Sequence, residues 1–164
     1  MNEITGQIDI REHKFAIVAS RFNDFIVEKL VAGTHRQLLD LGANDDNLDL
    51  FWVPGAYETP AVASRLAASD EYAAIVCLGA VIRGATPHFD YVAGEAAHGI
   101  AEAARAHGTP VIFGILTTDT VEQAMERAID GDGNKGAEAA TSAVQMLKLY
   151  SGISNRLRGA RSKK

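Results

Sequence analysis

The chain has 164 residues and a formal net charge of −5; hydrophobic residues make up 47% of it and charged residues 23%. This length suits a single domain with an ordinary core, and this balance is typical of a globular protein that folds in water. The net acidity argues against nonspecific nucleic-acid binding, and no apolar run is long enough to span a membrane.

The first predicted element is an N-terminal arm, residues 1–12. Its opening, MNEITGQIDI, lacks the basic start and apolar centre of a secretion signal, so we expect a cytoplasmic protein. Ile4, Ile8 and Ile10 recur at even spacing, which is typical of an edge strand. No partner for such a strand is evident within one chain, and we expect a neighbouring subunit to supply one.

Four apolar runs rich in β-branched residues predict buried strands, at residues 15–20, 48–53, 73–82 and 110–117. The third run contains the single cysteine, Cys77, which we expect to behave as a small buried hydrophobe. One cysteine allows neither an internal disulfide nor a cysteine-rich metal site.

Helical spacing appears in five stretches with recognisable starts or stops. They are residues 27–41 before Gly42, 61–68 after Pro60, 89–104 before Gly108, a segment from Thr120 with Gln123 in capping-box spacing, and a segment from near Asn134 through Tyr150. A basic tail, residues 152–164, follows, and we interpret it as a solvated end or as a contact to a neighbouring subunit or an anion. The alternation of strands and helices predicts an α/β fold, in a single domain over residues 1–164, with a largely parallel sheet covered on both faces.

In sheets of this kind, ligands bind beyond the carboxyl ends of the strands. Polar and glycine-rich residues follow each predicted strand, in the segments SRFND, VPGAYETP, RGATPHFD and TTDT. These four segments are therefore the candidate site.

The segment RGATPHFD carries the clearest chemistry. Thr86 is placed to cap a helix, Pro87 suits the first helical position, and His88 follows in the first turn. The helix terminus disfavours imidazolium, so we expect a neutral, proton-accepting His88 near pH 7. Gly84 and Ala85 let backbone N–H groups approach a phosphate. An exposed histidine on an ordinary capped helix is the alternative interpretation.

Two earlier segments offer contacts to a ligand. Phe22 presents a flat face to a planar heterocycle, and Asn23 is placed to cap the next helix. Ala56 keeps a pocket wall thin, and Glu58 can accept hydrogen bonds from sugar or polyol hydroxyls. A core phenylalanine and an ordinary helix-start glutamate are the alternatives, and each is the more common case in isolation.

Two cations complete the candidate site. Arg127 lies near the end of the fourth helix, and its guanidinium can bind a phosphate through two hydrogen bonds at once. Lys135 begins the last helix. A lysine at a helix N-terminus is electrostatically unfavourable, which indicates an anion or carboxylate nearby. The other histidines have no convincing metal-ligand spacing, and we interpret them as structural or exposed: His13, His35, His98 and His107.

Together these segments resemble the lumazine synthase family. SRFN, VPGAYETP, LGAVIRGATPHFDYV, FGILTTD, QAMERA and GNKG stand in that family's order and spacing, and the resemblance covers residues 10–150. It implies a three-layer α/β sandwich whose four-stranded parallel sheet has flavodoxin-like topology. It also implies a reaction without cofactor or metal: 5-amino-6-(D-ribitylamino)uracil condenses with L-3,4-dihydroxy-2-butanone 4-phosphate to give 6,7-dimethyl-8-(D-ribityl)lumazine, phosphate and water, the penultimate step of riboflavin biosynthesis.

The same resemblance implies a role for each site residue. His88 moves protons, and the phosphate is bound by Ala85, Thr86 and Arg127. The pyrimidine and the ribityl chain are bound by Phe22, Asn23, Ala56, Tyr57, Glu58, Val81, Ile82, Phe113 and Lys135.

The resemblance further implies a homopentamer with its sites between adjacent subunits. Phe113, Arg127 and Lys135 come from one subunit and the other site residues from its neighbour, whose sheet the N-terminal strand also joins. Some members assemble pentamers into a 60-subunit icosahedral shell, and the uninterrupted segment RAIDGDGNKG favours the shell here. Riboflavin synthase is the implied functional partner.

Two features depart from the family pattern, and one alternative function stays open. Pro87 stands where some members have threonine, and the basic tail exceeds the usual ending. The alternative is a non-catalytic protein that binds or stores riboflavin or FMN on the same scaffold.

Overall fold

In the computed structural model, which describes residues 1–129, 131 and 133–161, four parallel strands lie in the order β2-β1-β3-β4. They are β1 (Phe15–Ser20), β2 (Leu48–Val53), β3 (Ala74–Ile82) and β4 (Val111–Thr118). The sequence predicted every strand to within one residue at each end. The flavodoxin-like order that the resemblance implied is confirmed.

The two central strands are buried on both faces, which explains their continuous apolar runs. Every residue of β1 is buried, as is every residue of β3 except the last. Their side chains alternate between two core clusters, with Phe15 and Ile17 on one face and Ala16 and Val18 on the other. Cys77 is fully buried, and this burial raises its pKa to about 12, so the prediction of a buried hydrophobe is confirmed.

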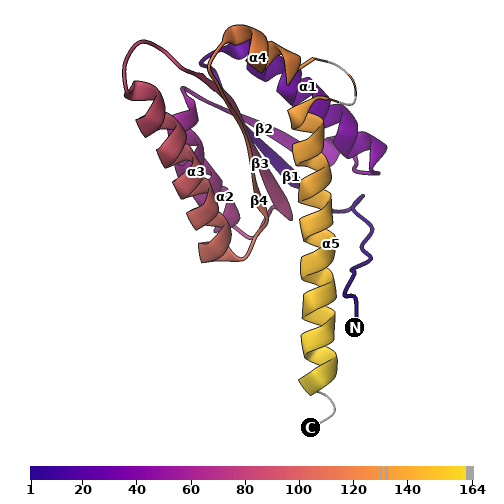
Figure 1. The fold of residues 1–164 in the computed structure, drawn as a ribbon. Helices are drawn as coiled ribbons and strands as arrows, with labels where there is room; N and C mark the ends of the chain where they lie inside the picture. The colour runs from indigo at the N-terminus through magenta and orange to yellow at the C-terminus, as the bar shows by residue number, and fades with distance from the viewer. Residues whose placement is uncertain (130, 132, 162–164) are drawn as a thin grey trace.

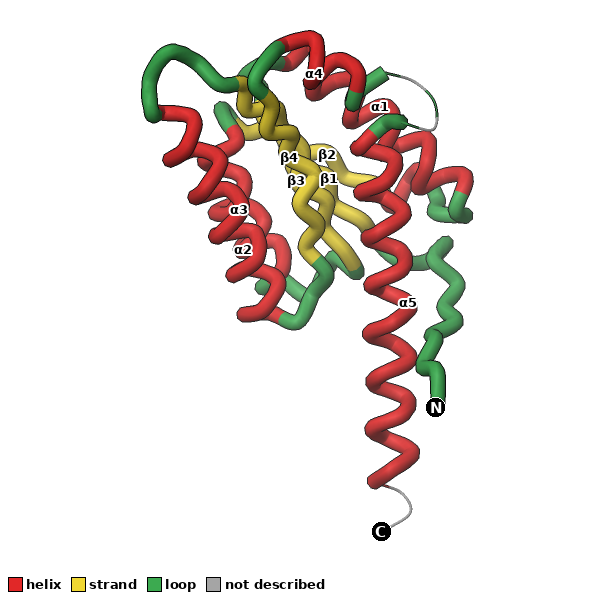
Figure 2. The backbone as a smooth tube through the Cα atoms, viewed as in Figure 1, coloured by secondary structure: helices red, strands yellow, loops and turns green. Residues whose placement is uncertain are grey.

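Helices cover both faces of the sheet and make three layers (Figures 1 and 2). One face carries α1 (Asp24–Asp40), α4 (Val121–Glu126) and α5 (Lys135–Arg161), and the other carries α2 (Thr59–Ala67) and α3 (His88–His107). Two short 3₁₀ turns, η1 (Asp45–Asn47) and η2 (Ala56–Glu58), flank β2. Among the described helices, none is both long enough and apolar enough to cross a membrane.

Three predicted helix boundaries, at Gly42, Gly108 and Thr120, agree with the structure. Gly42, with φ +103°, follows α1, and Gly108, with φ +68°, ends α3 by donating its N–H to the Ala104 carbonyl at 3.2 Å. Glycine adopts these left-handed angles without a Cβ penalty. Thr120 caps α4, because its Oγ1 accepts a hydrogen bond from the Gln123 N–H at 3.2 Å.

The last helix is longer than predicted, and its predicted end at Tyr150 is wrong. α5 continues to Arg161 through most of the basic tail. The continuation contains no proline, and Leu149, Ile153 and Leu157 recur every fourth residue, as on one side of a helix. The last residues of the tail, 162–164, and positions 130 and 132 of the segment RAIDGDGNKG lie outside the described residues.

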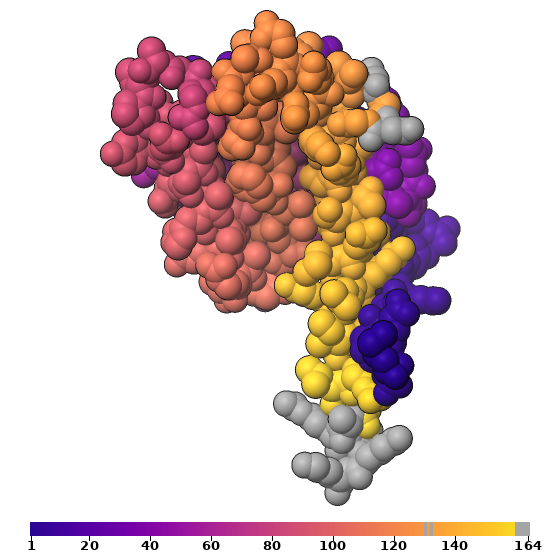
Figure 3. Space-filling model, viewed as in Figure 1, coloured from indigo at the N-terminus to yellow at the C-terminus, as the bar shows by residue number. Residues whose placement is uncertain are grey.

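The N-terminal arm forms no strand within the described chain and runs beside the far half of α5 (Figure 3). The contact is closest at Gly6 and Gly152. A Cβ on Gly6 would overlap the Lys148 carbonyl oxygen, and a Cβ on Gly152 would lie 3.0 Å from the Gly6 nitrogen. Pairing of the arm with a neighbouring subunit stays a prediction.

Candidate functional site

The segments that follow β1, β2 and β3 meet beside α2 and α3 and enclose a cavity of about 660 Å³. This cavity is called the heterocycle cavity below. Eight of the predicted site residues line it: Phe22, Ala56, Tyr57, Glu58, Val81, Ile82, Thr86 and His88. Sequence reasoning missed Tyr91, which also lines the cavity and is 74% exposed. Tyr91 follows His88 by three residues on α3, so helical spacing is the signal that places it there.

Backbone hydrogen bonds that extend the β1–β2 pairing hold Phe22 at the rim of this cavity. The Arg21 N–H donates to the Val53 carbonyl at 2.8 Å, and the Phe22 N–H donates to the Pro54 carbonyl at 3.1 Å. The Arg21 guanidinium also lies 4.2 Å from the centre of the Trp52 ring. Phe22 itself is 72% exposed, so the alternative of a core phenylalanine is wrong.

Asn23 occupies the N-cap position of α1, but its side chain does not cap the helix. Its Nδ2 instead donates to the carbonyl of Ala80 on β3 at 2.8 Å. Its backbone is left-handed, with φ 60° and ψ 41°, a conformation that asparagine tolerates better than most residues. The predicted capping role is therefore corrected: Asn23 ties the β1–α1 turn to the centre of the sheet.

The turn after β2 places Glu58 both at a helix start and on the cavity wall. Ala56, Tyr57 and Glu58 form η2, and the buried Thr59 hydroxyl donates to the Ala56 carbonyl at 2.7 Å. A Cβ on Gly55 would lie 3.1 Å from Glu58 Oε2, so glycine leaves room for the carboxylate. The two interpretations of Glu58 are thus compatible, because the same residue is the N-cap of α2 and lines the cavity.

The cap of α3 lies one residue later than predicted. Pro87, with φ −64° and ψ −1°, is the N-cap, and no side chain caps the helix, so the predicted capping role of Thr86 is wrong. The proline ring fixes φ, and the Pro87 carbonyl accepts the first bond, from the Asp90 N–H at 3.0 Å. His88 is consequently the first residue of α3, and Thr86 lines the cavity.

Arg83 braces the loop before His88, and sequence reasoning missed it. Its Nε donates to Asp119 at 3.1 Å, its Nη1 lies 3.3 Å from Asp90, and its guanidinium lies 4.1 Å from the centre of the Phe89 ring. Asp119 follows β4 and Asp90 is on α3. No spacing in the sequence shows that these two carboxylates converge on one arginine. Asp119 comes close to Arg83 only because β3 and β4 pair side by side in the folded sheet.

A second cavity, of about 330 Å³, lies along the edge strand β4 beside α5. It is called the edge cavity below, and Phe113, Arg127 and Lys135 line it. Arg127 is the C-cap of α4, and its Nη1 donates to the Gln123 carbonyl at 2.8 Å. Lys135 Nζ lies 2.6 and 2.8 Å from the two carboxylate oxygens of Glu138, one turn along α5. Glu138 is thus the carboxylate that the position of Lys135 indicated, and their i, i+3 spacing was the signal for it.

A single chain therefore holds the predicted site residues in two separate cavities. Two predicted site residues line neither cavity: Asn23, in the β1–α1 turn, and Ala85, exposed on the loop before α3. Over residues 1–129, 131 and 133–161, no group of three or more His, Cys, Asp or Glu side chains lies close enough together to hold a metal ion.

Comparison with known proteins gives one family match. Residues 12–151 match the family model described as 6,7-dimethyl-8-ribityllumazine synthase. Among solved structures, the chain is similar to a de novo designed Rossmann fold protein, with 18% sequence identity and a TM-score of 0.38; the likeness covers 68% of this chain and 90% of that chain. This structural likeness is too weak to carry an argument.

The two features of Asn23 can be separated by substitution. Asn23→Ala removes the hydrogen bond to Ala80 and places a Cβ in the left-handed region, so we expect the free energy of unfolding to fall by about 2 kcal/mol. Asn23→Gly removes the bond without a Cβ penalty in the left-handed region, although it makes the unfolded chain more flexible, and should lower it by less, about 1 kcal/mol. Urea denaturation of both variants measures the two values. Equal losses would show that the backbone angle contributes nothing.

Proposed function

We propose that the heterocycle cavity is one half of the active site of a lumazine synthase, because the chain belongs to the 6,7-dimethyl-8-ribityllumazine synthase family. Membership makes the chain an enzyme of riboflavin biosynthesis that acts on small-molecule substrates and catalyses the condensation step. One observation carries the assignment of residues: exposed Phe22 and His88, the first residue of α3, line the same cavity. The family also supports a cytoplasmic location, and riboflavin synthase as the partner that consumes the product.

The pyrimidine substrate lies in the heterocycle cavity. Phe22 stacks on its ring, as a 72% exposed aromatic face beside an apolar wall is suited to do. Val81 and Ile82 form that wall with Ala56, and Asn23 holds the turn that carries Phe22. Glu58 accepts hydrogen bonds from the ribityl hydroxyls, and Tyr57 stands beside it on the rim.

The phosphate of the second substrate lies at the start of α3. The first turn of a helix has backbone N–H groups without intrahelical partners and a partial positive charge, and no side chain caps α3. Ala85 and the Thr86 hydroxyl stand just before this turn. Arg127 supplies the second positive group that a phosphate ester needs in order to leave as an anion.

A neighbouring subunit supplies Arg127, with Phe113 and Lys135. The separation of the two cavities in one chain supports this, because the edge cavity lies along β4 beside α5 while the heterocycle cavity lies beside α2 and α3. An edge strand with exposed Phe113 also leaves this side of the sheet available for another copy. A cyclic pentamer repeats one such contact five times, and the uninterrupted sequence RAIDGDGNKG between α4 and α5 favours a shell of twelve pentamers, as the family resemblance implies.

The proposed condensation requires proton transfers between well-positioned groups and involves no oxidation or reduction. The 5-amino nitrogen attacks the ketone carbon, and water leaves to give an imine. The imine makes the neighbouring C–H acidic, so loss of that proton expels phosphate and leaves an enol. The enol ketonises, and the ribityl-bearing nitrogen closes the second ring with loss of another water. His88 accepts and returns the protons of these steps, and holding the two substrates together supplies much of the remaining rate enhancement.

The activity is tested by mixing the purified protein with both substrates. We expect lumazine absorbance and released phosphate to appear together and well above the uncatalysed rate. Riboflavin and FMN serve as the comparison ligands. Tight flavin binding without product formation would contradict the proposed enzymatic function and would favour a flavin-binding or storage protein.

Single substitutions should separate the contributions of the two cavities to proton transfer and to phosphate binding. His88→Ala removes the proton relay and should lower kcat by about 100-fold without abolishing turnover, because positioning remains. Arg127→Ala removes a charged phosphate contact and should raise KM for the keto-phosphate by about 10- to 100-fold. Steady-state kinetics with each substrate varied distinguishes these effects. Complete loss of product with His88→Ala in a correctly assembled protein would contradict this division.

The assembly is measured by size-exclusion chromatography with light scattering. We expect a 60-subunit particle, and a dissociated monomer should be nearly inactive because its cavities hold only half a site each. A stable pentamer would contradict the predicted shell but would remain consistent with a site shared between adjacent subunits. A monomer with full activity would contradict the shared site itself.

A further inference from the structure

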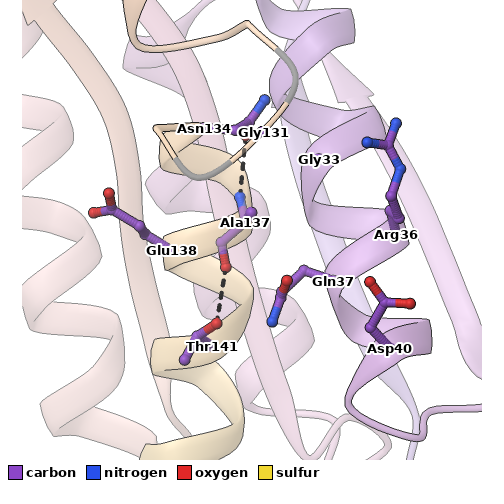
Figure 4. A pocket seen from close by; sticks show the side chains of 9 residues that line it. All are labelled: Gly33, Arg36, Gln37, Asp40, Gly131, Asn134, Ala137, Glu138 and Thr141. Carbon is purple, nitrogen blue, oxygen red and sulfur yellow. Dashed lines mark hydrogen bonds between the residues drawn. The ribbon is translucent and has the colours of Figure 1, made fainter.

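Asn134 joins three segments of the chain beside the edge cavity. It precedes Lys135, the first residue of α5, and its side chain is 2% exposed. Its Oδ1 accepts hydrogen bonds from the N–H groups of Gly136 at 2.9 Å and Ala137 at 3.1 Å, so it caps α5. Figure 4 shows Asn134 at the start of this helix, with the bond to Ala137 dashed.

The other half of the amide makes contacts that a cap does not need. Nδ2 donates to the carbonyl of Ala128 at 2.9 Å and to the carbonyl of Lys29, on α1, at 3.2 Å. The amide orientation is fixed by these partners, because backbone N–H groups face the oxygen and carbonyls face the nitrogen. All four hydrogen bonds of a buried amide are therefore satisfied, and they reach α5, α1 and the residue after Arg127.

Close packing leaves Asn134 no room to move. A Cβ on Gly33 of α1 would overlap the Asn134 side chain, and a Cβ on Gly136 would overlap the Leu30 carbonyl. Figure 4 shows Gly33 facing this end of α5. A backbone hydrogen bond also connects the same two segments, because the Lys135 N–H donates to the Arg127 carbonyl at 2.9 Å. The spacing between Arg127 and Lys135 is thus set by two hydrogen bonds, one of which depends on Asn134.

We infer that Asn134 is a positioning residue for Arg127, the phosphate-binding cation: its Nδ2 hydrogen bonds hold the backbone of Arg127 in register with Lys135 at the edge cavity. This inference rests on the proposed function, in which Arg127 binds the phosphate of the keto substrate. Asn134 touches no substrate. It acts by fixing the backbone that carries the two cations, and a small displacement of a charged contact is enough to weaken binding strongly.

Asn134→Ser separates this role from helix capping. Serine caps a helix about as well as asparagine but lacks the Nδ2 donor, and it adds no charge near the phosphate, as aspartate would. We expect Asn134→Ser to raise KM for the keto-phosphate by about 10-fold, and to raise KM for the pyrimidine by less, because the serine cap still holds the start of α5 that carries Lys135. Inorganic phosphate, used as a competitive inhibitor, should bind correspondingly more weakly.

Two further variants serve as controls for the Asn134→Ser measurement. Val144→Ala shortens a buried side chain in the middle of α5, away from both cations, and should destabilise the fold without changing either KM. Arg127→Ala tests the proposed function itself. If Arg127→Ala raises the KM for the keto-phosphate and Asn134→Ser leaves it at the wild-type value, the inference about Asn134 is wrong. If Arg127→Ala has no effect on this KM or on phosphate inhibition, the phosphate role of the edge cavity is wrong, and the inference fails with it.

Discussion

The parallel arrangement of four strands is the constraint on which the site depends. It brings the carboxyl end of every strand to one edge of the sheet, where the turns after β1, β2 and β3 enclose the heterocycle cavity. The chain then passes from α3 through β4 to α4 and α5 on the opposite face. The helices that follow β4 are consequently separated from α2 and α3 by the sheet, although Asp119, directly after β4, still bonds Arg83 beside the heterocycle cavity. This topology explains why one chain holds predicted site residues in two cavities, and we propose that a second copy of the chain brings them together.

Two asparagines stabilise these half-sites in the same way. Asn23 donates to a carbonyl of β3 that is 57 residues away in sequence, and Asn134 donates to a carbonyl of α1 that is 105 residues away. Each bond fixes a turn that carries candidate binding residues: Phe22 in the first case, Arg127 and Lys135 in the second. A side-chain amide suits this task because its NH₂ group can donate to a distant carbonyl; only Asn134 also accepts hydrogen bonds from its own turn. The turns beside both cavities are thus held by hydrogen bonds from side chains that line neither of them.

The sequence predicted most of the fold and several members of the site because these depend on local patterns. Apolar runs located the strands, and exposed Phe22 and His88 were found from their places after strands. The cap of α3 was placed at Thr86 because residue preference does not decide between two adjacent positions, whereas the dihedral angles of Pro87 do. Arg83 and the full role of Asn134 were missed because their partners are distant in sequence. The end of α5 was missed because a basic composition was interpreted as solvated chain, although it also suits an exposed helix.

The shared site is tested most directly by co-expressing His88→Ala and Arg127→Ala chains. Each variant alone damages every site of its assembly, but in a mixed assembly about one quarter of the interfaces combine an intact His88 from one chain with an intact Arg127 from its neighbour. We expect the mixed assembly to be clearly more active than the average of the two variants alone, with a keto-phosphate KM near the wild-type value for the recovered fraction. Activity equal to that average would contradict a site built from two subunits.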